Sequence, residues 1–572
     1  MKLINIIPIH LFLYCTHGTV LPKDDNSCCP DKSCCPRGVD SNPPKDGPDG
    51  GIKWTQCNLD IPDYKDLEKN KAYECGNLTV PLDYTDKGNK NHTILNLIKL
   101  KADKESTNKA PKGSIIMNPG GPGASGVEFL LQLDPNITNS LFDGQYDIIS
   151  FDPRGTGKTL VPPESNGFPK QMTDELFYAV QNSSYSLIEQ VELLFSDFFD
   201  YVSTFTELFV TRDEEFRKFR GTAFVARDIA EIATALDEGN QINYWGSSYG
   251  TVLGQVLAGM FPGRIERMLL DGNLLVDDYV ENLGLDSIRD AEEALYHFYD
   301  ECMAASNNTC HSANKLPKQR DGFLKALNRV FMVCTGVGGA LDRPKSLSLT
   351  GRVLGALYRG IDGYLELDDL IDTALEGNRS MCLQERSNAT LSTLWSPQSE
   401  LAHLAILCTD ATFRAETIEE FISYFSLYEG KQALHNPFFL WGLLSTSPCS
   451  RWNVHAAQPI NLTSLSRIKT KNPVLLFNGR YDPVTPLGNA RKISARFPGS
   501  QVVVYEGVGH GALLNAHSSS CISDIVTRYF IDGEVPRKET TCKPDQTAFE
   551  LVEERRKKRA ELGENRKIPV FL

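Results

Sequence analysis

Short apolar runs alternate with amphipathic helical stretches along much of this chain, and this alternation restricts the possible fold more than any other feature. Two runs, GSIIMN (113–118) and YDIISFD (146–152), are β-branched and closed by Pro-Gly or Asp-Pro, as buried parallel strands often are. Similar runs lie at 242–248, 264–273, 472–483 and 500–511. Helical periods follow at 249–261 and 487–497. The pattern predicts an α/β chain with a mostly parallel sheet and helices on both faces.

Between about 280 and 465 the pattern changes to amphipathic helical stretches, such as 288–305 and 417–430, with apolar residues three or four apart. This predicts a large helical cap inserted between two strands of one sheet, and a smaller insertion is expected at about 160–220. The expected organisation is a signal peptide (1–18), a Cys/Pro-rich leader (19–53), a first core part (54–280), the cap (281–465), a C-terminal core part (466–545) and a charged tail (546–572).

The N-terminus has the pattern of a secretory signal peptide. Lys2 precedes an apolar run of about a dozen residues, too short to span a bilayer comfortably, and small residues follow at Thr16 and Gly18. The alternative, a buried N-terminal strand, would lead directly into a polar segment rich in Cys and Pro. No later run approaches the roughly 18 to 20 apolar residues of a membrane helix. We therefore expect a secreted, extracellular or lumenal protein.

Cysteines and glycosylation sequons favour the same compartment. Cys15 would leave with the signal peptide, so the 15 cysteines reduce to an even mature count. Disulfides are the natural interpretation, with their connectivity left open. Near neighbours are Cys57 and Cys75, Cys302 and Cys310, and Cys521 and Cys542, while Cys334, Cys382, Cys408 and Cys449 lie mid-chain. A further cluster, Cys28 to Cys35, lacks the C-x-x-C spacing and the histidines usual for zinc. Eight N-x-S/T sequons lie at Asn77, Asn91, Asn136, Asn182, Asn307, Asn378, Asn388 and Asn461.

The charge balance restricts the partners. The formal net charge is −14, which argues against nucleic acid or an anionic membrane as the main partner. The basic run EERRKKR near the C-terminus is interpreted as a solvated helix rather than a nucleic-acid patch.

Two adjacent serines, Ser247 and Ser248, lie between a predicted strand and a predicted helix. The sequence Gly246-Ser247-Ser248-Tyr249-Gly250 fits G-x-S-x-G with Ser248 at its centre. After a strand and before a helix, this pattern predicts a nucleophile elbow, in which a strained turn presents the serine hydroxyl. The alternative is a simple turn of small residues.

A serine nucleophile needs a base, and the base needs an acid that fixes its tautomer. His510, in YEGVGHGALL, follows the last long strand, and Asp482, in NGRYDPVTP, follows the preceding one. His517 is a less favoured base, because it is expected on or near the next helix. Each residue has an ordinary alternative as a turn cap or a loop residue. The order Ser248, Asp482, His510 is nevertheless that of the α/β-hydrolase fold.

The glycine-rich loop NPGGPGASG follows an early strand and is interpreted as part of an oxyanion hole. Bare backbone N–H groups in such a loop can face a developing negative charge. We assign the two donors to the N–H groups of Gly121 and Tyr249, and the alternative is a simple turn.

These motifs resemble the secreted tripeptidyl-aminopeptidase-like branch of the prolyl aminopeptidase family, serine peptidases of α/β-hydrolase fold. NPGGPGASG, DIISFDPRGTGKT, YWGSSYGTVLG, RMLLDGN, NGRYDPVTP and GHGALLNAHSSSC carry the resemblance, which extends from about 54 to 545. Asn118-Pro119 replaces the histidine of HGGPG in close relatives, and Lys158-Thr159 stands where a serine is common. Neither departure touches the triad.

The resemblance implies an aminopeptidase that releases short peptides or single residues from free N-termini. The expected serine mechanism needs no metal or organic cofactor. A cap carboxylate could pair with the substrate ammonium. The candidates are Glu281, Glu292, Glu293 and Glu366, and the choice among them stays open. Arg154, in DPRG, is interpreted as a structural ion-pair residue rather than a substrate ligand.

Two other functions remain open. The same triad serves a carboxylesterase or lipase, and a hydrolase scaffold can also be a non-catalytic binding protein. An epoxide or haloalkane hydrolase is disfavoured because it would have Asp at the elbow. The expected partners are small peptide substrates, with no nucleic acid and no membrane beyond the signal peptide, and the oligomeric state stays open.

Overall fold

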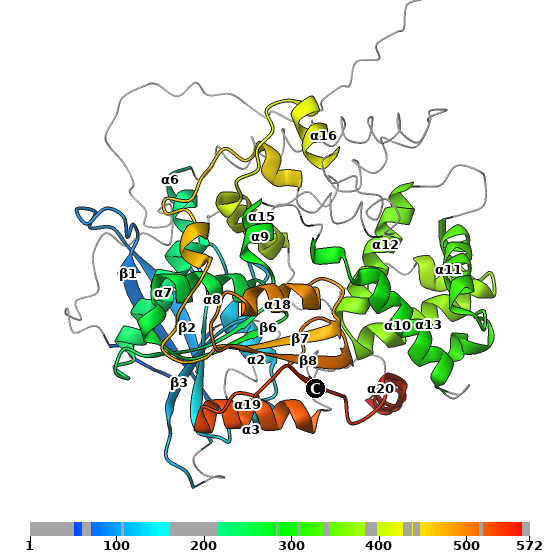
Figure 1. Cartoon of the computed structure of the whole chain (residues 1–572), viewed down its shortest axis with the longest axis horizontal. Coiled ribbons are helices and arrows are strands. Elements are labelled where there is room, and N and C mark those ends of the chain that lie inside the picture. Colours follow the sequence, from blue (N-terminus) through cyan, green and yellow to red (C-terminus); the bar gives the residue numbers. More distant parts are fainter. Residues whose placement is uncertain are drawn as a thin grey trace, which may run out of the picture. The chain divides into compact units, whose positions relative to one another are not determined.

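The structure is a computed structural model of the whole chain (Figure 1). It describes residues 51–59, 70–103, 108–160, 214–281, 284, 286–305, 309–335, 343–383, 397–426, 438, 447–513 and 519–562. The expected signal peptide, the Cys28 to Cys35 cluster, most of the 160–220 insertion and His517 lie outside these residues.

Nine strands of the described residues form one sheet in the order β1-β2-β4-β3-β5-β6-β7-β8-β9. The strands are β1 Tyr73–Pro81, β2 His92–Leu100, β3 Gly113–Asn118, β4 Tyr146–Phe151, β5 Ile242–Ser247, β6 Ile265–Asp271, β7 Leu475–Tyr481, β8 Gln501–Val508 and β9 Thr540–Cys542. The β1–β2 and β2–β4 pairs are antiparallel, and all other pairs are parallel. The predicted, mostly parallel sheet is confirmed, and its parallel strands share one carboxyl edge.

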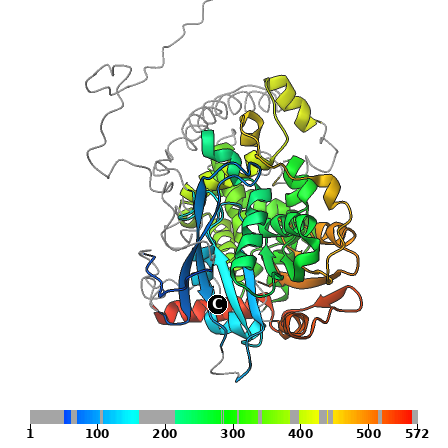
Figure 2. The same ribbon diagram turned by 90° about the vertical axis from the view of Figure 1, so that its left-hand side faces the viewer.

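Helices cover both faces of the sheet (Figures 1 and 2). On one face lie α7 Thr222–Ala235, α8 Tyr249–Met260, α9 Val276–Glu281 and α18 Leu487–Ser494, and on the other lie α2 Gly126–Gln132, α3 Pro135–Leu141 and α19 Ser520–Asp532. Successive strand residues alternate between the two cores: Tyr244 of β5 packs with α7 and α8, and Trp245 packs with α2 and α19. This period of two is why the strand runs read as continuously apolar.

The segment between β6 and β7 is helical, as the sequence predicts. It contains α10 Ala291–Ala304, α11 Arg320–Thr335, α12 Arg343–Tyr358, α13 Ile361–Leu375, α14 Ser380–Leu383, α15 Pro397–Asp410 and α16 Ile418–Ser426. Helices α10 to α13 share a core with α20 Ala548–Leu562, at the right of Figure 1. Helix α15 instead packs into the core of α7 and α8 through Ile406 and Cys408. The cap therefore has two parts, one with its own core and one built onto the sheet.

The remaining described helical elements are short. They are α6 Glu214–Arg217, η2 Lys218–Arg220, η3 Pro262–Arg264, η4 Asp286–Ile288, η5 His311–Asn314, η8 Ser447–Arg451 and η9 Leu462–Leu465.

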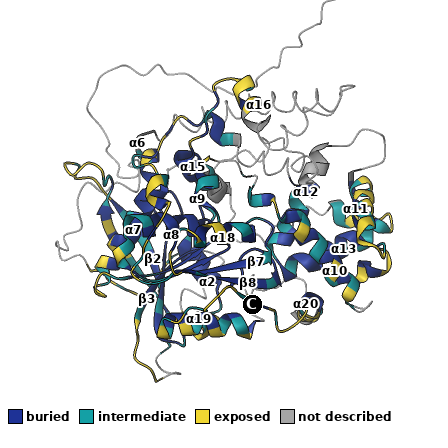
Figure 3. Ribbon diagram, viewed as in Figure 1, coloured by how far each residue is buried: buried dark blue, intermediate teal, exposed yellow. Residues whose placement is uncertain are grey.

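The charged run near the C-terminus forms helix α20, but the helix is not solvated all round. Phe549 and Val552 are buried against the cap, and the Arg556 guanidinium pairs with Asp368 of α13 (2.6 Å). One face of the helix that contains the basic run therefore packs against the cap, where an arginine of the run forms an ion pair with a buried carboxylate. Figure 3 shows that the cap helices likewise carry both buried and exposed residues along their length.

Five disulfides join the ten described cysteines in pairs. They are Cys57–Cys75, Cys302–Cys310, Cys334–Cys382, Cys408–Cys449 and Cys521–Cys542. The three pairs of near neighbours in the sequence are thus all bonded, and the mid-chain cysteines pair within the cap segment. None of the described helices combines the length and apolarity that crossing a bilayer requires.

Candidate active site

Ser248 lies at the turn between β5 and α8 in a backbone conformation that L-residues rarely adopt. Its φ is 56° and its ψ is −125°, whereas Ser247 ends β5 and is fully buried. Ser248 is partly exposed. A Cβ at Gly246 would lie 2.2 Å from the carbonyl oxygen of Gly250, so only glycine allows the strand and the helix to approach so closely here. The turn has the geometry expected of a nucleophile elbow, and it presents the second serine rather than the first.

Asp482 follows β7 directly and is fully buried. Its carboxylate accepts hydrogen bonds from the backbone N–H groups of Thr485 (2.8 Å) and Gly511 (2.9 Å) and from the Thr485 hydroxyl (2.6 Å). Burial opposes ionisation, but the neighbouring His510 and these donors outweigh it and hold the pKa of Asp482 below its usual value. Asp482 is therefore an anion at neutral pH.

His510 follows β8, and its Nδ1 lies 2.9 Å from Oδ2 of Asp482. An ionised carboxylate can only accept, so Nδ1 carries the proton and Nε2 is the basic nitrogen of the neutral ring. The backbone N–H of His510 donates to the carbonyl oxygen of Tyr358 (2.9 Å), and the two rings lie 4.6 Å apart. Tyr358 is the last residue of α12, so the cap fixes both the backbone and the ring of His510.

Asp271 at the end of β6 joins the elbow to the histidine loop. Its carbonyl oxygen accepts the N–H of Ser248 (2.9 Å), and its buried carboxylate accepts the N–H groups of Ala512 (2.7 Å) and Leu513 (2.9 Å). Burial raises the pKa of Asp271 to about 6, against the pull of the two N–H donors. Asp271 thus places the elbow and the His510 loop side by side at the carboxyl edge of the sheet. In the sequence, nothing marks Asp271 as more than part of the strand run at 264–273.

The glycine-rich loop after β3 packs against the elbow. A Cβ at Gly120 would lie 2.8 Å from Cβ of Ser248 and 2.9 Å from the backbone nitrogen of Tyr249. Within the described residues, the N–H groups of Gly121 and Tyr249 donate to no acceptor of the protein. Asn118 is buried and accepts the N–H of Gly120 through its side chain (3.0 Å). The loop and the start of α8 therefore each have one backbone N–H group, at Gly121 and at Tyr249, that no described acceptor of the protein uses.

Arg154 is structural, as the sequence analysis favours. It is fully buried and pairs with Asp228 of α7 (2.7 Å), and it also donates to the carbonyl oxygens of Pro81 and Leu82 (2.6 Å each). The guanidinium thus ties β1 to α7 and has no role at Ser248.

Two of the four candidate carboxylates for a substrate ammonium are already paired. Glu366 binds Arg352 (2.6 Å) and Arg359, and Glu293 binds Arg320 (2.9 Å). Glu281 and Glu292 lie in α9 and α10. The structure therefore does not single out one cap carboxylate for the substrate.

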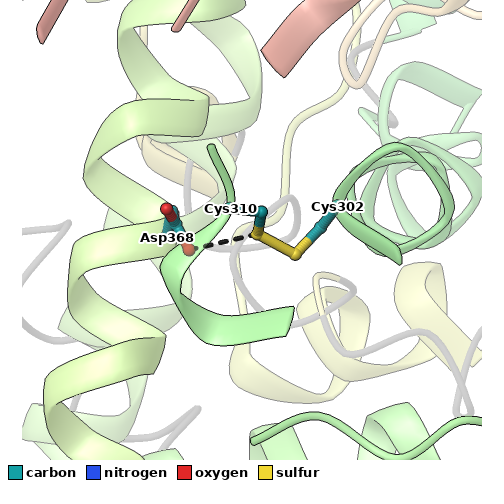
Figure 4. Close-up of side chains that lie close together, drawn as sticks. All are labelled: Cys302, Cys310 and Asp368. Carbon is teal, nitrogen blue, oxygen red and sulfur yellow. Dashed lines mark hydrogen bonds between the residues drawn. A yellow bond between two sulfur atoms is a disulfide. The ribbon is translucent and has the colours of Figure 1, made fainter. Parts of the chain in front are cut away.

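Among the described residues of the cap, two groups of side chains could hold a metal ion, and both groups are engaged with protein partners. Figure 4 shows Cys302 and Cys310 bonded to each other, with Oδ1 of Asp368 3.2 Å from the Cys310 sulfur. The second group, His311, Asp368 and Asp369, shares its carboxylates with the Arg556 guanidinium. We assign no metal to either group.

The comparisons with known proteins agree with this site. Residues 113–295 match the family model of the alpha/beta hydrolase fold, and residues 436–542 match that of TAP-like proteins. The first match contains Ser248 and the glycine-rich loop, and the second contains Asp482 and His510. The two matches lie on either side of most of the cap, which is where the sequence predicts the insertion.

Curated relatives cover most of the chain. A tripeptidyl aminopeptidase of Streptomyces lividans is 27% identical over an alignment of 531 positions, which covers 87% of this chain and 87% of the relative. The serine protease Hip1 of Mycobacterium bovis is 25% identical over 516 residues, covering 86% and 91% of the two chains. Carboxylesterase B of Mycobacterium tuberculosis is 25% identical over 519 residues, covering 86% and 90%.

Among solved structures, a serine hydrolase of Cycloclasticus zankles is 12% identical and covers 84% of this chain and 99% of its own, with a TM-score of 0.28. That likeness is too low to carry an argument. The fold follows from the strand order and the family matches instead. The chain is a serine hydrolase of the α/β-hydrolase fold, homologous over most of its length to tripeptidyl aminopeptidase and to the serine protease Hip1.

Proposed function

We propose that Ser248, His510 and Asp482 form a catalytic triad, with the N–H groups of Gly121 and Tyr249 as the oxyanion hole. The observation that carries the proposal is the 2.9 Å contact between Nδ1 of His510 and Asp482, beside a serine held at positive φ. This contact orients the imidazole and leaves Nε2 as the base. Asp271 supports the proposal further, because it touches both the elbow and the histidine loop.

The triad works by acyl transfer. His510 takes the proton of the Ser248 hydroxyl, whose oxygen attacks the scissile carbonyl carbon, and the resulting oxyanion accepts from the two backbone N–H groups. His510 then gives its proton to the leaving amine as the C–N bond breaks. Water repeats the sequence on the acyl-enzyme and releases the free acid, so every proton is accounted for by one imidazole. The ionised Asp482 stabilises the imidazolium at each step.

The substrate we propose is a peptide with a free N-terminus, from which the enzyme releases short peptides or single residues. The names of two relatives, a tripeptidyl aminopeptidase and a serine protease, support this choice. The helical cap supports it as well, since helices over the carboxyl edge of the sheet restrict entry to small substrates. A carboxylesterase is the second candidate, because one relative carries that name and the same triad cleaves esters.

We also propose that the enzyme is secreted or lumenal. The five disulfides of the described residues are typical of proteins that fold in an oxidising compartment. The signal-like N-terminus and the sequons point to the same compartment.

Steady-state hydrolysis of three matched substrates tests the function: a peptidyl-anilide with a free N-terminus, the same anilide acetylated, and a short-chain ester. An aminopeptidase cleaves the free anilide at least about ten-fold faster, in kcat/KM, than the acetylated one, because a paired ammonium is worth 1.4 kcal/mol or more. Equal turnover of the blocked peptide would contradict the aminopeptidase, and cleavage of the ester alone would favour the esterase. The Ser248→Ala variant is the control for contaminating hydrolases.

A further inference from the structure

Helix α15 of the cap is linked to both backbone segments of the proposed oxyanion hole, directly to the glycine-rich loop and indirectly, through α7, to Tyr249. Its residues His403 and Asp410 are seven positions apart, which places them on one face of the helix, two turns from each other. His403 reaches the glycine-rich loop after β3. Asp410 reaches the first residues of α7 and, through them, Tyr249 of α8.

His403 holds the loop through one hydrogen bond. Its Nδ1 lies 3.1 Å from the carbonyl oxygen of Pro122, the residue after Gly121. Burial lowers the pKa of His403, so the ring is neutral, and because a carbonyl oxygen only accepts, Nδ1 must carry the proton. The Pro122–Gly123 peptide, one residue beyond Gly121, is therefore fixed from the cap side.

Asp410 holds Tyr249 through a directed chain of hydrogen bonds. The carboxylate is buried and accepts from the backbone N–H and the hydroxyl of Thr222, and from the hydroxyl of Tyr279 (3.1 Å). The Thr222 hydroxyl has one proton, which goes to Asp410. It therefore accepts from the Tyr249 hydroxyl, 2.6 Å away. The Tyr279 ring packs against the Tyr249 ring, with 5.4 Å between the ring centroids.

Helix α15 itself is anchored to the sheet side of the molecule. The Cys408–Cys449 disulfide joins its last turn to η8, and Trp452 donates from Nε1 to the Thr409 hydroxyl (3.2 Å). Ile406 is buried in the core of α7 and α8. An anchored helix can transmit its position to both donor segments.

We propose that His403 and Asp410 are positioning residues that align the oxyanion hole. The position of helix α15 against the sheet would then affect the catalytic rate. The proposal rests on the function proposed above. It assigns to this cap helix a part in transition-state stabilisation, which is distinct from any part in restricting substrate size.

Three variants test this alignment. Tyr249→Phe removes the hydroxyl at the end of the hydrogen-bond chain that begins at Asp410. His403→Leu removes the donor to the Pro122 carbonyl oxygen, and His403→Asn restores a donor at the place of Nδ1. Because removing an oxyanion donor outright costs 10²–10³ in kcat, a misaligned one is expected to cost about ten-fold. We expect Tyr249→Phe and His403→Leu to lower kcat about that much, with KM within two-fold of wild type, and His403→Asn to keep at least half of kcat.

Two controls separate alignment from general damage. Tyr146→Phe removes an equally buried tyrosine hydroxyl, which donates to Phe530 (2.8 Å) on the opposite face of the sheet, and His455→Leu changes an exposed histidine. Both should leave kcat unchanged. Inhibition by a peptide aldehyde, whose hemiacetal oxygen occupies the oxyanion site, should weaken in Tyr249→Phe and His403→Leu, while inhibition by a product peptide should not.

The outcomes are distinct. Unchanged kcat in Tyr249→Phe and His403→Leu, or a rise in KM alone, would overturn the positioning role of His403 and Asp410. The proposed peptidase function would still stand. If His403→Leu does not fold, Tyr249→Phe and the aldehyde measurement decide the question. A wild-type protein that cleaves none of the substrates would contradict the proposed function itself, and with it the positioning role of His403 and Asp410.

Discussion

Residues far away in the sequence hold Ser248 in its strained backbone conformation. A non-glycine residue in such a conformation costs about 1–3 kcal/mol, and it persists only where the surroundings fix it. Here the Ser248 N–H is held by Asp271, and a Cβ at Gly120 of the glycine-rich loop would lie 2.8 Å from Cβ of Ser248. The strain presents the hydroxyl at the carboxyl edge of the sheet, next to the loop that carries His510.

Asp482 is expected to matter for catalysis far more than for stability. In Asp482→Asn the amide can present its NH₂ group to His510, which would favour the wrong tautomer and lower kcat by about 10⁴-fold. Steady-state kinetics on a peptidyl-anilide measures this effect. Asp524→Asn, at an exposed position of α19, should keep full activity. A loss of less than ten-fold in Asp482→Asn would contradict the assigned acid.

The site residues that the sequence marks and those that it does not mark differ in their local signals. Ser248 is marked by a local motif, and Asp482 and His510 each follow a strand whose carboxyl end meets the same edge. Asp271 also ends a parallel strand at this edge, but no motif or required partner marks it, and His403 lies in an inserted helix. Their hydrogen-bond partners lie 241 and 281 residues away along the chain. The strands and helices themselves can be read from local periods, whereas contacts between inserted segments and the core require the packed structure.

At the scale of elements, helix α9 contains a carboxylate whose ionisation opposes folding. Burial and the nearby Asp286 and Glu281 raise the pKa of Asp278 to about 7, against Lys492 and Arg289. The folded state thus binds a proton more tightly than the unfolded chain. The stability from this proton is complete only below the ordinary pKa of an Asp carboxyl, about 4, and is lost as the pH rises through about 7.

The Asp278→Asn variant should remove this pH dependence. We expect it to gain on the order of 1 kcal/mol of stability at pH 8 and little at pH 4. Urea unfolding at the two pH values measures the difference. An equal effect at both would mean that the Asp278 carboxyl is not perturbed.

Two disulfides offer a comparison between elements. Cys408–Cys449 anchors α15, whereas Cys521–Cys542 joins α19 to β9, and the bonded cysteines are 41 and 21 residues apart. Removing either pair should cost about 2–4 kcal/mol of stability. If α15 aligns the oxyanion hole, only the double variant Cys408→Ala/Cys449→Ala should also lose kcat, at a temperature where both proteins stay folded. Equal kcat in both would speak against a role for the anchored helix.

At the scale of the whole molecule, the described sequons are all accessible. The five asparagines of these sequons are exposed, namely Asn77, Asn91, Asn136, Asn378 and Asn461. Expressed with its N-terminus in a eukaryotic secretory cell, the protein should leave the cell and carry glycans at these positions. Peptide mapping after enzymatic deglycosylation in heavy-oxygen water locates the sites. Retention of an unmodified protein inside the cell would contradict the proposed compartment.

Ser248 is the proposed nucleophile, and its neighbour Ser247 provides a matched control. A fluorophosphonate probe forms a covalent bond with an activated serine, and mass spectrometry of the digested protein locates that bond. We expect the label on Ser248 in the wild-type protein and in Ser247→Ala, and no label in Ser248→Ala. A label on any other serine, or labelling that persists in Ser248→Ala, would contradict the account.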